Sequence, residues 1–191
     1  MEQIDRRAWN HEYESGRWDY LGDTREKIRY RTLGEEIEKQ GVAPSVLDLG
    51  CGSCLLYQTL GGAGFAGRYL GVDWARSSLP TGPWPPGHGV ICADICDLPV
   101  AGHFDVIVCN EVLYYLPSPV TVVTELQNRL TPGGIMLISL FQPKFSRLPE
   151  WSRHIDRLGA ALADANGYIG RRIVTAAGRT WHLYSMRRIS R

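Results

Sequence analysis

The sequence predicts an α/β fold: a doubly wound, seven-stranded sheet in a single domain, with an antiparallel hairpin at its C-terminal end. First, an apolar run of strand length, 45–49, stops at two glycines spaced by one residue, and apolar helix-forming residues follow. Second, a later apolar run ends in Asp73, at the distance from the glycines expected of an acidic residue at the end of a second strand. Third, two closing runs, 168–175 and 180–187, have strand character and a short turn between them.

The N-terminal segment, 1–40, is predicted to be helical and to form a lid on the domain that spans 1–191. A helix at 24–40 is expected, with Thr24 as its N-cap and Gly41 as its C-cap. A helical layer over one sheet face would account for most of these residues. The aromatic side chains that precede this helix are more than such a layer needs, which favours a lid over a ligand.

Further strands and connections follow the glycine turn. Residues 68–72 and 89–93 are the expected second and third strands. The proline-rich stretch between them, 79–89, excludes more than a stub of helix, so Trp84 is expected to cover the sheet face from an extended loop. The run 104–110 is apolar until its polar end, which is typical of a buried parallel strand. The remaining expected elements are a helix at 119–130, a turn at 131–134, a strand at 135–140 and a helix at 149–163.

The glycine turn carries an acidic residue, Asp48, two positions before Gly50, and Gly52 is its second glycine. Glycine is needed where the backbone must adopt a positive φ and let a ligand approach closely. The dinucleotide fingerprint would need a third glycine at the position of Leu55. The D-x-G-x-G arrangement resembles motif I of the class I methyltransferases that depend on S-adenosyl-L-methionine (SAM), in which this loop wraps the methionine and ribose part of SAM.

Other stretches resemble one branch of that class. Residues 111–116, Glu-Val-Leu-Tyr-Tyr-Leu, are close in wording to the nodulation-type N-methyltransferases that act on chitooligosaccharides, as are residues 15–21, 29–30 and 178–181. The resemblance implies a Rossmann-like sheet in the strand order of the class, with SAM as cofactor and S-adenosyl-L-homocysteine (SAH) as product. It also implies metal-independent methyl transfer to N or O of a small molecule, such as a sugar or glycan.

The residues expected to bind the cofactor lie in the N-terminal segment and near the ends of the first four strands. Asp73 would hold the two ribose hydroxyls through charge-assisted hydrogen bonds. By the same resemblance, Asp94 would accept the adenine amino group, and a backbone N–H beside it would meet the ring. The full set is Trp18, Tyr30, Asp48, Gly50, Cys51, Gly52, Asp73, Trp74, Asp94, Ile95, Asn110 and Glu111.

Glu111, His11 and His154 are the candidate catalytic residues, because each could reach the edge of the sheet at which open α/β folds bind ligands. Glu111 is favoured by its place in a stretch that resembles motif IV of the class. A carboxylate there could orient an amine or take the proton of a sugar hydroxyl. The other interpretation is that Glu111 caps the turn that begins at Val112.

Composition and the placement of cysteines narrow the kind of protein and its expected location. The chain has 44% hydrophobic and 21% charged residues, which is ordinary for a globular domain. It has no apolar run of ~18 residues and no apolar core of a signal peptide at its start, so we expect a cytoplasmic protein, monomeric or homodimeric, without a membrane partner. Its five cysteines fall in the glycine loop or beside strands, which favours reduced thiols over a zinc site. They are Cys51, Cys54, Cys92, Cys96 and Cys109.

The last 48 residues carry ten basic and three acidic side chains. This excess either attracts an anionic substrate, such as a sugar nucleotide or nucleic acid, or keeps edge strands from pairing. We expect a small-molecule substrate. Three alternatives remain open: an RNA-modifying methyltransferase, with RNA binding that depends steeply on salt; a non-catalytic SAM-binding subunit, which would copurify with another chain; and an NAD-dependent oxidoreductase, which would bind NAD and not SAM.

Overall fold

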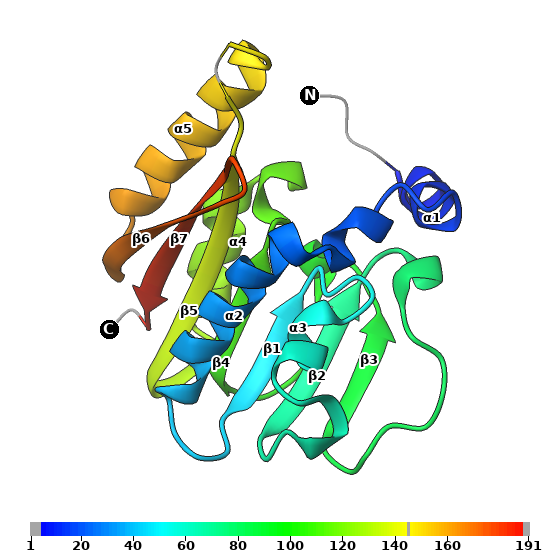
Figure 1. Cartoon of the computed structure of the whole chain (residues 1–191). Helices are drawn as coiled ribbons and strands as arrows, with labels where there is room; N and C mark the ends of the chain where they lie inside the picture. Colours follow the sequence, from blue (N-terminus) through cyan, green and yellow to red (C-terminus); the bar gives the residue numbers. More distant parts are fainter. Residues whose placement is uncertain (1–4, 145, 189–191) are drawn as a thin grey trace.

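The structure, a computed structural model, describes residues 5–144 and 146–188 and contains one twisted sheet with helices on both faces (Figure 1). The strands are β1 (Ser45–Leu49), β2 (Arg68–Asp73), β3 (His88–Cys92), β4 (Phe104–Asn110), β5 (Leu130–Gln142), β6 (Tyr168–Ala176) and β7 (Arg179–Arg187). The helices are α1 (Arg6–Glu14), α2 (Thr24–Glu38), α3 (Leu55–Thr59), α4 (Pro119–Gln127) and α5 (Pro149–Ala163).

The seven strands lie in the order β3-β2-β1-β4-β5-β7-β6. The first five pair in parallel, β7 pairs antiparallel with β5, and β6 pairs antiparallel with β7 as a hairpin. This confirms the predicted doubly wound α/β sheet with a C-terminal hairpin. Parallel strands joined by crossover helices place all their carboxyl ends at one edge of the sheet, and a ligand site is expected at that edge.

Two apolar cores cover the two faces of the sheet. Alternate residues of a strand point to opposite faces, so Val46 and Leu47 of β1 enter different cores. Helices α2 and α3 cover the core that contains Val46, and α4 and α5 cover the core that contains Leu47 (Figure 1). All five residues of β1 are buried, as predicted for a strand in the middle of a parallel sheet.

The start of β5 differs from the prediction. A helix to residue 130 and a turn at 131–134 were expected, but α4 ends at Gln127 and β5 begins at Leu130. Leu130 pairs with Phe104, and the register shifts before Val106 pairs with Ile135. The proline and glycines of this stretch therefore lie in an irregular part of the strand, because pairing with β4 extends the ladder past residues that locally favour a turn.

The helix caps also differ in detail, and the proline-rich loop agrees with the prediction. The N-cap of α2 is Asp23, one position before the expected Thr24. Its C-cap is Lys39, two positions before the expected Gly41.

Between β2 and β3 only a single 3-10 turn forms. The ring of Trp84 packs 5.1 Å from that of Tyr57, against the core on the α2 and α3 side. An aromatic side chain from the loop thus covers sheet that a helix would otherwise cover.

Strand β6 is an edge of the sheet, and its exposed residues include Arg171, Arg172 and Ile173. Arg172 lies 3.4 Å from both Glu35 and Glu36 of α2. This placement agrees with the interpretation that part of the C-terminal excess of basic side chains protects an edge strand.

None of the helices within residues 5–144 and 146–188 has the length and apolar character that a membrane span requires.

Candidate active site

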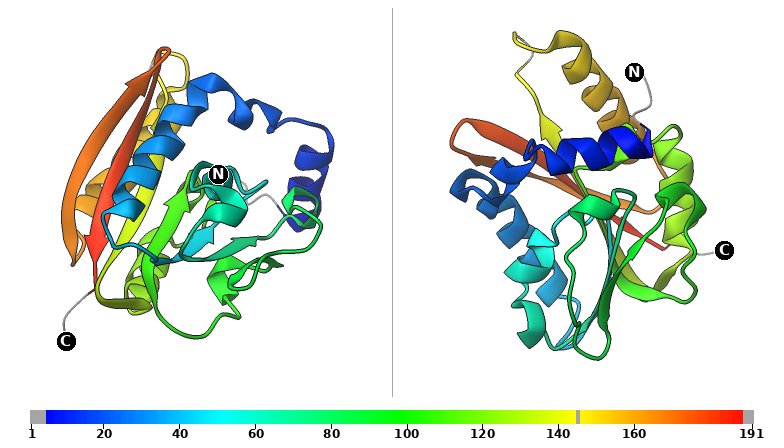
Figure 2. Two further views of the ribbon diagram at one scale, coloured as in Figure 1. Left: turned by 60° about the horizontal axis from the view of Figure 1, so that its bottom comes forward. Right: turned by 90° about the vertical axis from the view of Figure 1, so that its right-hand side faces the viewer.

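A cavity of about 490 Å³ lies at the edge where β1, β2 and β4 end, and the N-terminal segment covers it. Figure 2 shows α1 and the start of α2 crossing this edge of the sheet. All twelve residues expected to bind a cofactor line the cavity, including Trp18 and Tyr30 from the N-terminal segment. Predicted residues as far apart in sequence as Trp18 and Glu111 therefore line one cavity.

The glycine loop after β1 has the backbone geometry that only glycine accepts easily. Gly50 has a φ of +69° and Gly52 a φ of +51°. A Cβ on Gly50 would lie 2.7 Å from Cγ2 of Val112, and a Cβ on Gly52 would lie 2.8 Å from the hydroxyl oxygen of Tyr13. Both positions therefore need glycine for the turn and for the close approach of their neighbours.

Asp73, at the end of β2, fastens the glycine loop to the sheet. Its Oδ2 accepts a hydrogen bond from the backbone N–H of Gly52 at 2.9 Å, and its Oδ1 accepts from the backbone N–H of Ala75 at 2.8 Å. Burial raises the pKa of this carboxyl, and the backbone donors oppose that effect. Each carboxylate oxygen keeps a lone pair for a further donor, so the side chain can also bind ligand hydroxyls.

Asp48 is a buried carboxylate with one oxygen unpaired. The hydroxyl of Tyr69 donates to its Oδ2 at 2.6 Å, while Oδ1 has no hydrogen-bond partner among the described residues. Burial raises the pKa of Asp48 to about 7; the hydrogen bond from Tyr69 lowers it, and the charge of Asp73 raises it. The side chain is only 2% exposed, and it lines the cavity with an acceptor that a ligand can use.

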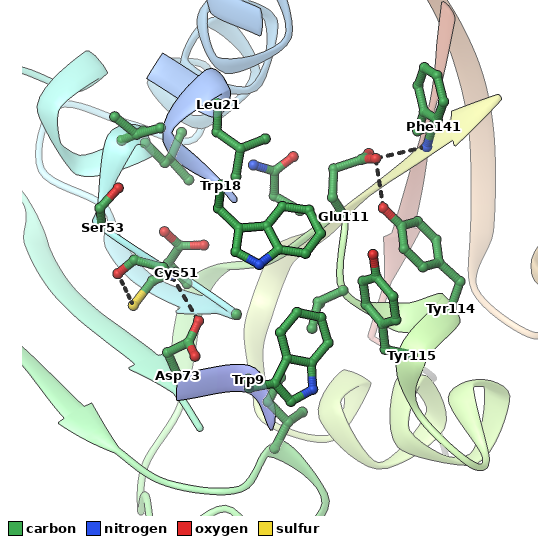
Figure 3. Close-up of a pocket in the computed structure, with 18 of the residues that line it drawn as sticks. Trp9, Trp18, Leu21, Cys51, Ser53, Asp73, Glu111, Tyr114, Tyr115 and Phe141 are labelled. Atoms are coloured by element: carbon green, nitrogen blue, oxygen red, sulfur yellow. Dashed lines mark hydrogen bonds between the residues drawn. The ribbon is translucent and has the colours of Figure 1, made fainter. Parts of the chain in front are cut away.

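Glu111 follows β4 directly and is held by donors from several elements. Its φ of +62° is one of three positive values at non-glycine residues in the described chain. Its Oε2 accepts from the Tyr114 hydroxyl at 2.9 Å and from the Phe141 N–H at 3.0 Å (Figure 3). Its Oε1 accepts from Ser139 Oγ at 2.5 Å. The carboxylate accepts no backbone N–H of the turn at Val112 in these contacts, so the alternative in which Glu111 caps that turn has no hydrogen bond to support it.

A buried ionic network joins Glu111 to the N-terminal segment and the hairpin. Arg29 lies 3.6 Å from Glu111 and 3.2 Å from Glu26, and the side chains of Arg29 and Glu26 are each 2% exposed. Arg179, at the start of β7, forms an ion pair with Glu26, and its guanidinium lies 5.2 Å from the ring centroid of Tyr20. Two carboxylates and two guanidinium groups thus compensate one another on one wall of the cavity.

Aromatic rings form the rest of the cover. Trp9 stacks on Trp18 with 5.8 Å between centroids and meets the edge of Tyr115 at 4.9 Å. Figure 3 shows Trp18 between Cys51 and Asp73 on one side and Glu111 and Tyr115 on the other. The cavity therefore has two halves, one at the glycine loop and one at the end of β4.

Known proteins resemble this chain in sequence and in fold. A family model described as a methyltransferase domain matches residues 47–138. The ubiquinone biosynthesis O-methyltransferases of Acinetobacter baumannii (strain AYE) and Bordetella pertussis (strain Tohama I) are 29% identical over 102 residues and 31% identical over 101 residues. Each match covers 49% of this chain and 42% and 41%, respectively, of the relative. The chain therefore spans less than half the length of these curated relatives.

Solved structures extend the likeness to almost the whole chain. The N-methyltransferase NodS from Bradyrhizobium japonicum WM9, in complex with SAH, has a TM-score of 0.71 and 20% identity, covering 97% of this chain and 98% of NodS. The 1,6-didemethyltoxoflavin-N1-methyltransferase of Burkholderia thailandensis has a TM-score of 0.68 and 18% identity, covering 97% of this chain and 87% of that protein. Residues 47–138 thus match a methyltransferase domain, and the whole chain has the fold of the class I, SAM-dependent methyltransferases. SAM is the cofactor of this class.

Two of the three catalytic candidates lie outside the cavity of this methyltransferase domain. His11 is an exposed residue of α1, and His154 on α5 has its Nε2 3.3 Å from the carbonyl oxygen of Tyr114. Neither lines the cavity, whereas Glu111 does. The α1 helix presents His11 to solvent, and α5 places His154 behind the turn after β4, so Glu111 is the candidate that the fold brings to the cofactor residues.

Several cavity residues of the methyltransferase domain were not predicted. They include one acidic and one basic residue of α2, an arginine and a tryptophan of β7, and two aromatic residues of α1. In that order they are Glu26, Arg29, Arg179, Trp181, Trp9 and Tyr13. The stretches 29–30 and 178–181 resemble the nodulation-type branch, and that resemblance was the available signal. No spacing rule could join them, because Glu26 and Arg179 are 153 positions apart.

The thiols of the methyltransferase domain lie where the sequence suggested. Cys51 and Cys54 are buried in the glycine loop, Cys109 is buried in β4, and all five cysteines are free. Within residues 5–144 and 146–188, no three histidine, cysteine, aspartate or glutamate side chains gather as a metal site.

Proposed function

We propose that this chain binds SAM in the described cavity and transfers its methyl group to N or O of a small molecule, with a sugar or glycan as the favoured class. One observation carries the proposal. Four buried polar atoms that line the cavity lack a partner among the described residues: Asp48 Oδ1, Asn110 Oδ1, Trp18 Nε1 and Arg29 Nε. They are two acceptors and two donors, which a ligand with both ammonium and carboxylate groups would satisfy.

The residues present fit each part of the cofactor. Asp73 offers carboxylate lone pairs to the ribose hydroxyls, and the positive-φ backbone of Gly50 and Gly52 leaves room beside the loop. Asp94 lines the cavity after β3, and its Oδ1 accepts from the N–H of Cys96 at 2.8 Å, which fixes the carboxylate near the expected adenine position. Ile95 is 8% exposed and supplies an apolar surface for the ring.

Positioning and exclusion of water would provide most of the acceleration. SAM supplies an activated methyl group on a sulfonium, so the protein needs to hold the acceptor atom in line with it and keep water out. Glu111 is fixed by three hydrogen bonds, and its Oε1 keeps a lone pair for an N–H or O–H of the acceptor. The rings of Tyr114, Tyr115 and Trp151 surround this half of the cavity.

The charge on the cavity wall supports a small neutral or cationic acceptor over nucleic acid. Five carboxyl groups and two guanidinium groups line it. The guanidinium groups, on Arg29 and Arg179, are already paired with Glu26 and Glu111. A phosphate-rich polymer would meet uncompensated negative charge there.

Incubation with labelled SAM and fractionated small-molecule and glycan pools tests the proposal. Transfer of label to RNA alone, or binding of NAD in place of SAM, would contradict it.

Loss of the Asp73 carboxylate is expected to weaken SAM binding. Asp73→Ala removes the charge-assisted hydrogen bonds to the ribose and also leaves the Gly52 N–H without its acceptor, so affinity should fall by at least about tenfold. Titration calorimetry with SAH measures the change. Asp105→Ala is the control, because that carboxylate binds Ser45 and Thr131 at the other end of the strands. Unchanged affinity in a folded Asp73→Ala protein would rule out this role.

The N-terminal segment is expected to close on the bound cofactor. Helix α1 has no buried residue, and hydrogen bonds between Asn10 and Ser77 hold it to the turn after β2. A ligand under Trp9 and Trp18 adds contacts to this weakly held segment. SAH should therefore slow tryptic cleavage after Arg17 several-fold and leave cleavage after Arg171, an exposed residue of β6 away from the cavity, unchanged. Equal cleavage rates with and without SAH would count against a mobile lid.

A further inference from the structure

Two thiols lie together in the glycine loop after β1. The Sγ atom of Cys51 lies 3.7 Å from the carbonyl oxygen of Gly52, and the Sγ atom of Cys54 lies 3.9 Å from the same oxygen. The two thiols also hydrogen-bond with each other, and this contact, followed by burial, raises the pKa of Cys51 well above its ordinary value. Residues 51–54 therefore carry a paired dithiol, for which the methyl-transfer chemistry proposed above has no use.

The second thiol of the pair is held on an unusual backbone conformation. Cys54 has a φ of +59° and a ψ of +39°, which is the left-handed region that favours glycine. A side chain is strained there, and residues in such conformations gather at functional sites. The loop thus keeps a sulfur beside Cys51 at a backbone position that would suit glycine better.

The two thiols differ in access to solvent. Cys51 is 9% exposed and lines the cavity, whereas Cys54 is 1% exposed and does not line it. A small oxidant that enters the cavity therefore meets Cys51 first. Cys54 lies behind it, where its thiol can react with an oxidised Cys51 and is itself protected from the oxidant.

The raised pKa has opposite effects on the rate and on the equilibrium of oxidation. Because the thiolate is the nucleophile, a thiol that stays protonated at neutral pH reacts slowly. The dithiols that are most easily formed from their disulfides are those whose reduced form is stabilised as a thiolate. The pair in this loop has no such stabilisation, so its disulfide should form slowly and persist until a reductant arrives.

We propose that Cys51 and Cys54 are a redox-sensitive pair, which a peroxide converts to a disulfide that weakens cofactor binding. The sulfur of Cys51 attacks one oxygen of hydrogen peroxide, the O–O bond breaks, and Cys51 becomes a sulfenic acid as one water leaves. The thiol of Cys54 then attacks that sulfur, the S–S bond forms, and the hydroxyl leaves as a second water. Two thiols lose two electrons, and one peroxide is reduced to two waters.

The new bond would disturb the loop that faces the cofactor. The sulfur of Cys51 packs against β2, since a Cβ on Gly71 would lie 2.8 Å from it. The backbone N–H of Gly52, between the two cysteines, donates to Asp73. Drawing the sulfurs together moves at least one of them and closes a ring that contains Gly52, so the loop and its bond to Asp73 shift. This consequence for the cofactor rests on the proposed function.

Peptide mapping tests the pairing directly. Trypsin releases Cys51 and Cys54 in one peptide, 40–68, and the other three cysteines in another, 77–129. The reduced full-length chain is treated with hydrogen peroxide, alkylated with iodoacetamide and digested. Peptide 40–68 should become lighter by two hydrogen atoms and take up no alkyl group, and SAH should slow this change several-fold. A cross-link between the two peptides, or oxidation of Cys51 with Cys54 still free, would overturn the proposal.

Titration calorimetry with SAH tests the consequence. The oxidised protein should bind SAH at least about tenfold more weakly, and dithiothreitol should restore the affinity. In Cys54→Gly nothing traps the sulfenic acid, so peroxide should carry Cys51 on to acids that dithiothreitol does not reduce, and the loss should become irreversible. Cys96→Ser is the control, because it removes an exposed thiol and keeps the pair, and its loss should stay reversible.

The outcomes separate this inference from the proposed function. A disulfide in peptide 40–68 that leaves SAH affinity unchanged would overturn the inference and leave the proposed function intact. A reduced protein that binds no SAH would overturn the proposed function and the effect on the cofactor together, while the peptide mass still decides the pairing. If Cys54→Gly does not fold, the peptide mass and the two affinities of the wild-type protein decide.

Discussion

Asp48→Asn is expected to remove a large pH-dependent destabilisation of the cofactor-free protein. Asp48 has a pKa of about 7 in the folded chain against 3.8 for the unperturbed group. An acid whose pKa is raised on folding binds more protons in the folded state, so its contribution to stability falls as pH rises from about 4 to about 7. Between pH 5 and pH 8 this loss is on the order of a few kcal/mol, at about 1.4 kcal/mol per pKa unit.

Urea denaturation of wild type and Asp48→Asn at pH 5 and pH 8 measures this effect as the change in their stability difference. The difference should move by a few kcal/mol in favour of the variant at pH 8. Tyr69→Phe is the matched comparison: it removes the donor to Oδ2 and should make the pH dependence steeper. Parallel stability curves for wild type and Asp48→Asn would show that the folded Asp48 titrates like an exposed acid.

Glu111→Gln is expected to lower methyl transfer by roughly 10²-fold while cofactor affinity and melting temperature stay near wild type. The amide can keep the hydrogen bonds from Tyr114 and Phe141 on its oxygen and donate its NH₂ to Ser139 Oγ, so the site keeps its shape. What it loses is the negative charge beside the acceptor atom and opposite Arg29, whose shorter ion pair with Glu26 remains. Single-turnover rates with saturating SAM, together with SAH titration, separate these effects.

Ser139→Ala is the control for Glu111, since it removes one hydrogen bond to the carboxylate and keeps the charge. It should cost much less activity than Glu111→Gln. Full activity of a folded Glu111→Gln protein would assign Glu111 to structural support of Tyr114 and Phe141 alone. Loss of stability together with loss of activity would point to the same conclusion, because the carboxylate would then act through the fold.

The sequence by itself determined the order and most bounds of the elements. β1 (Ser45–Leu49) and α5 (Pro149–Ala163) lie where the sequence predicts them. The signals for them are local: the spacing of apolar residues, the glycines that follow β1 and the proline in the first turn of α5. The sequence also determined the glycine loop, since a positive φ followed by a helix requires glycine at Gly50 and Gly52. Each of these signals depends on neighbours within a few residues.

Tertiary pairing decided the places where local signals conflict. Residues 131–134 favour a turn, yet pairing of Leu130 with Phe104 draws them into β5. Hydrogen bonds to a neighbouring strand outweigh a local preference when the strand edge is available over the whole stretch. A pattern within one segment carries no information about that edge.

Only the tertiary structure decided which charges share the cavity. Glu26 and Arg179 are 153 positions apart, yet they form an ion pair on its wall. The predicted candidates His11 and His154 are at reasonable positions in the chain, but His11 is exposed on α1, and His154 lies against the carbonyl oxygen of Tyr114, one turn of α5 beyond Trp151, which does line the cavity. Hydrophobic periodicity predicts which face of a helix is buried. The partner of a buried charge depends instead on how distant elements pack, which is a property of the whole fold.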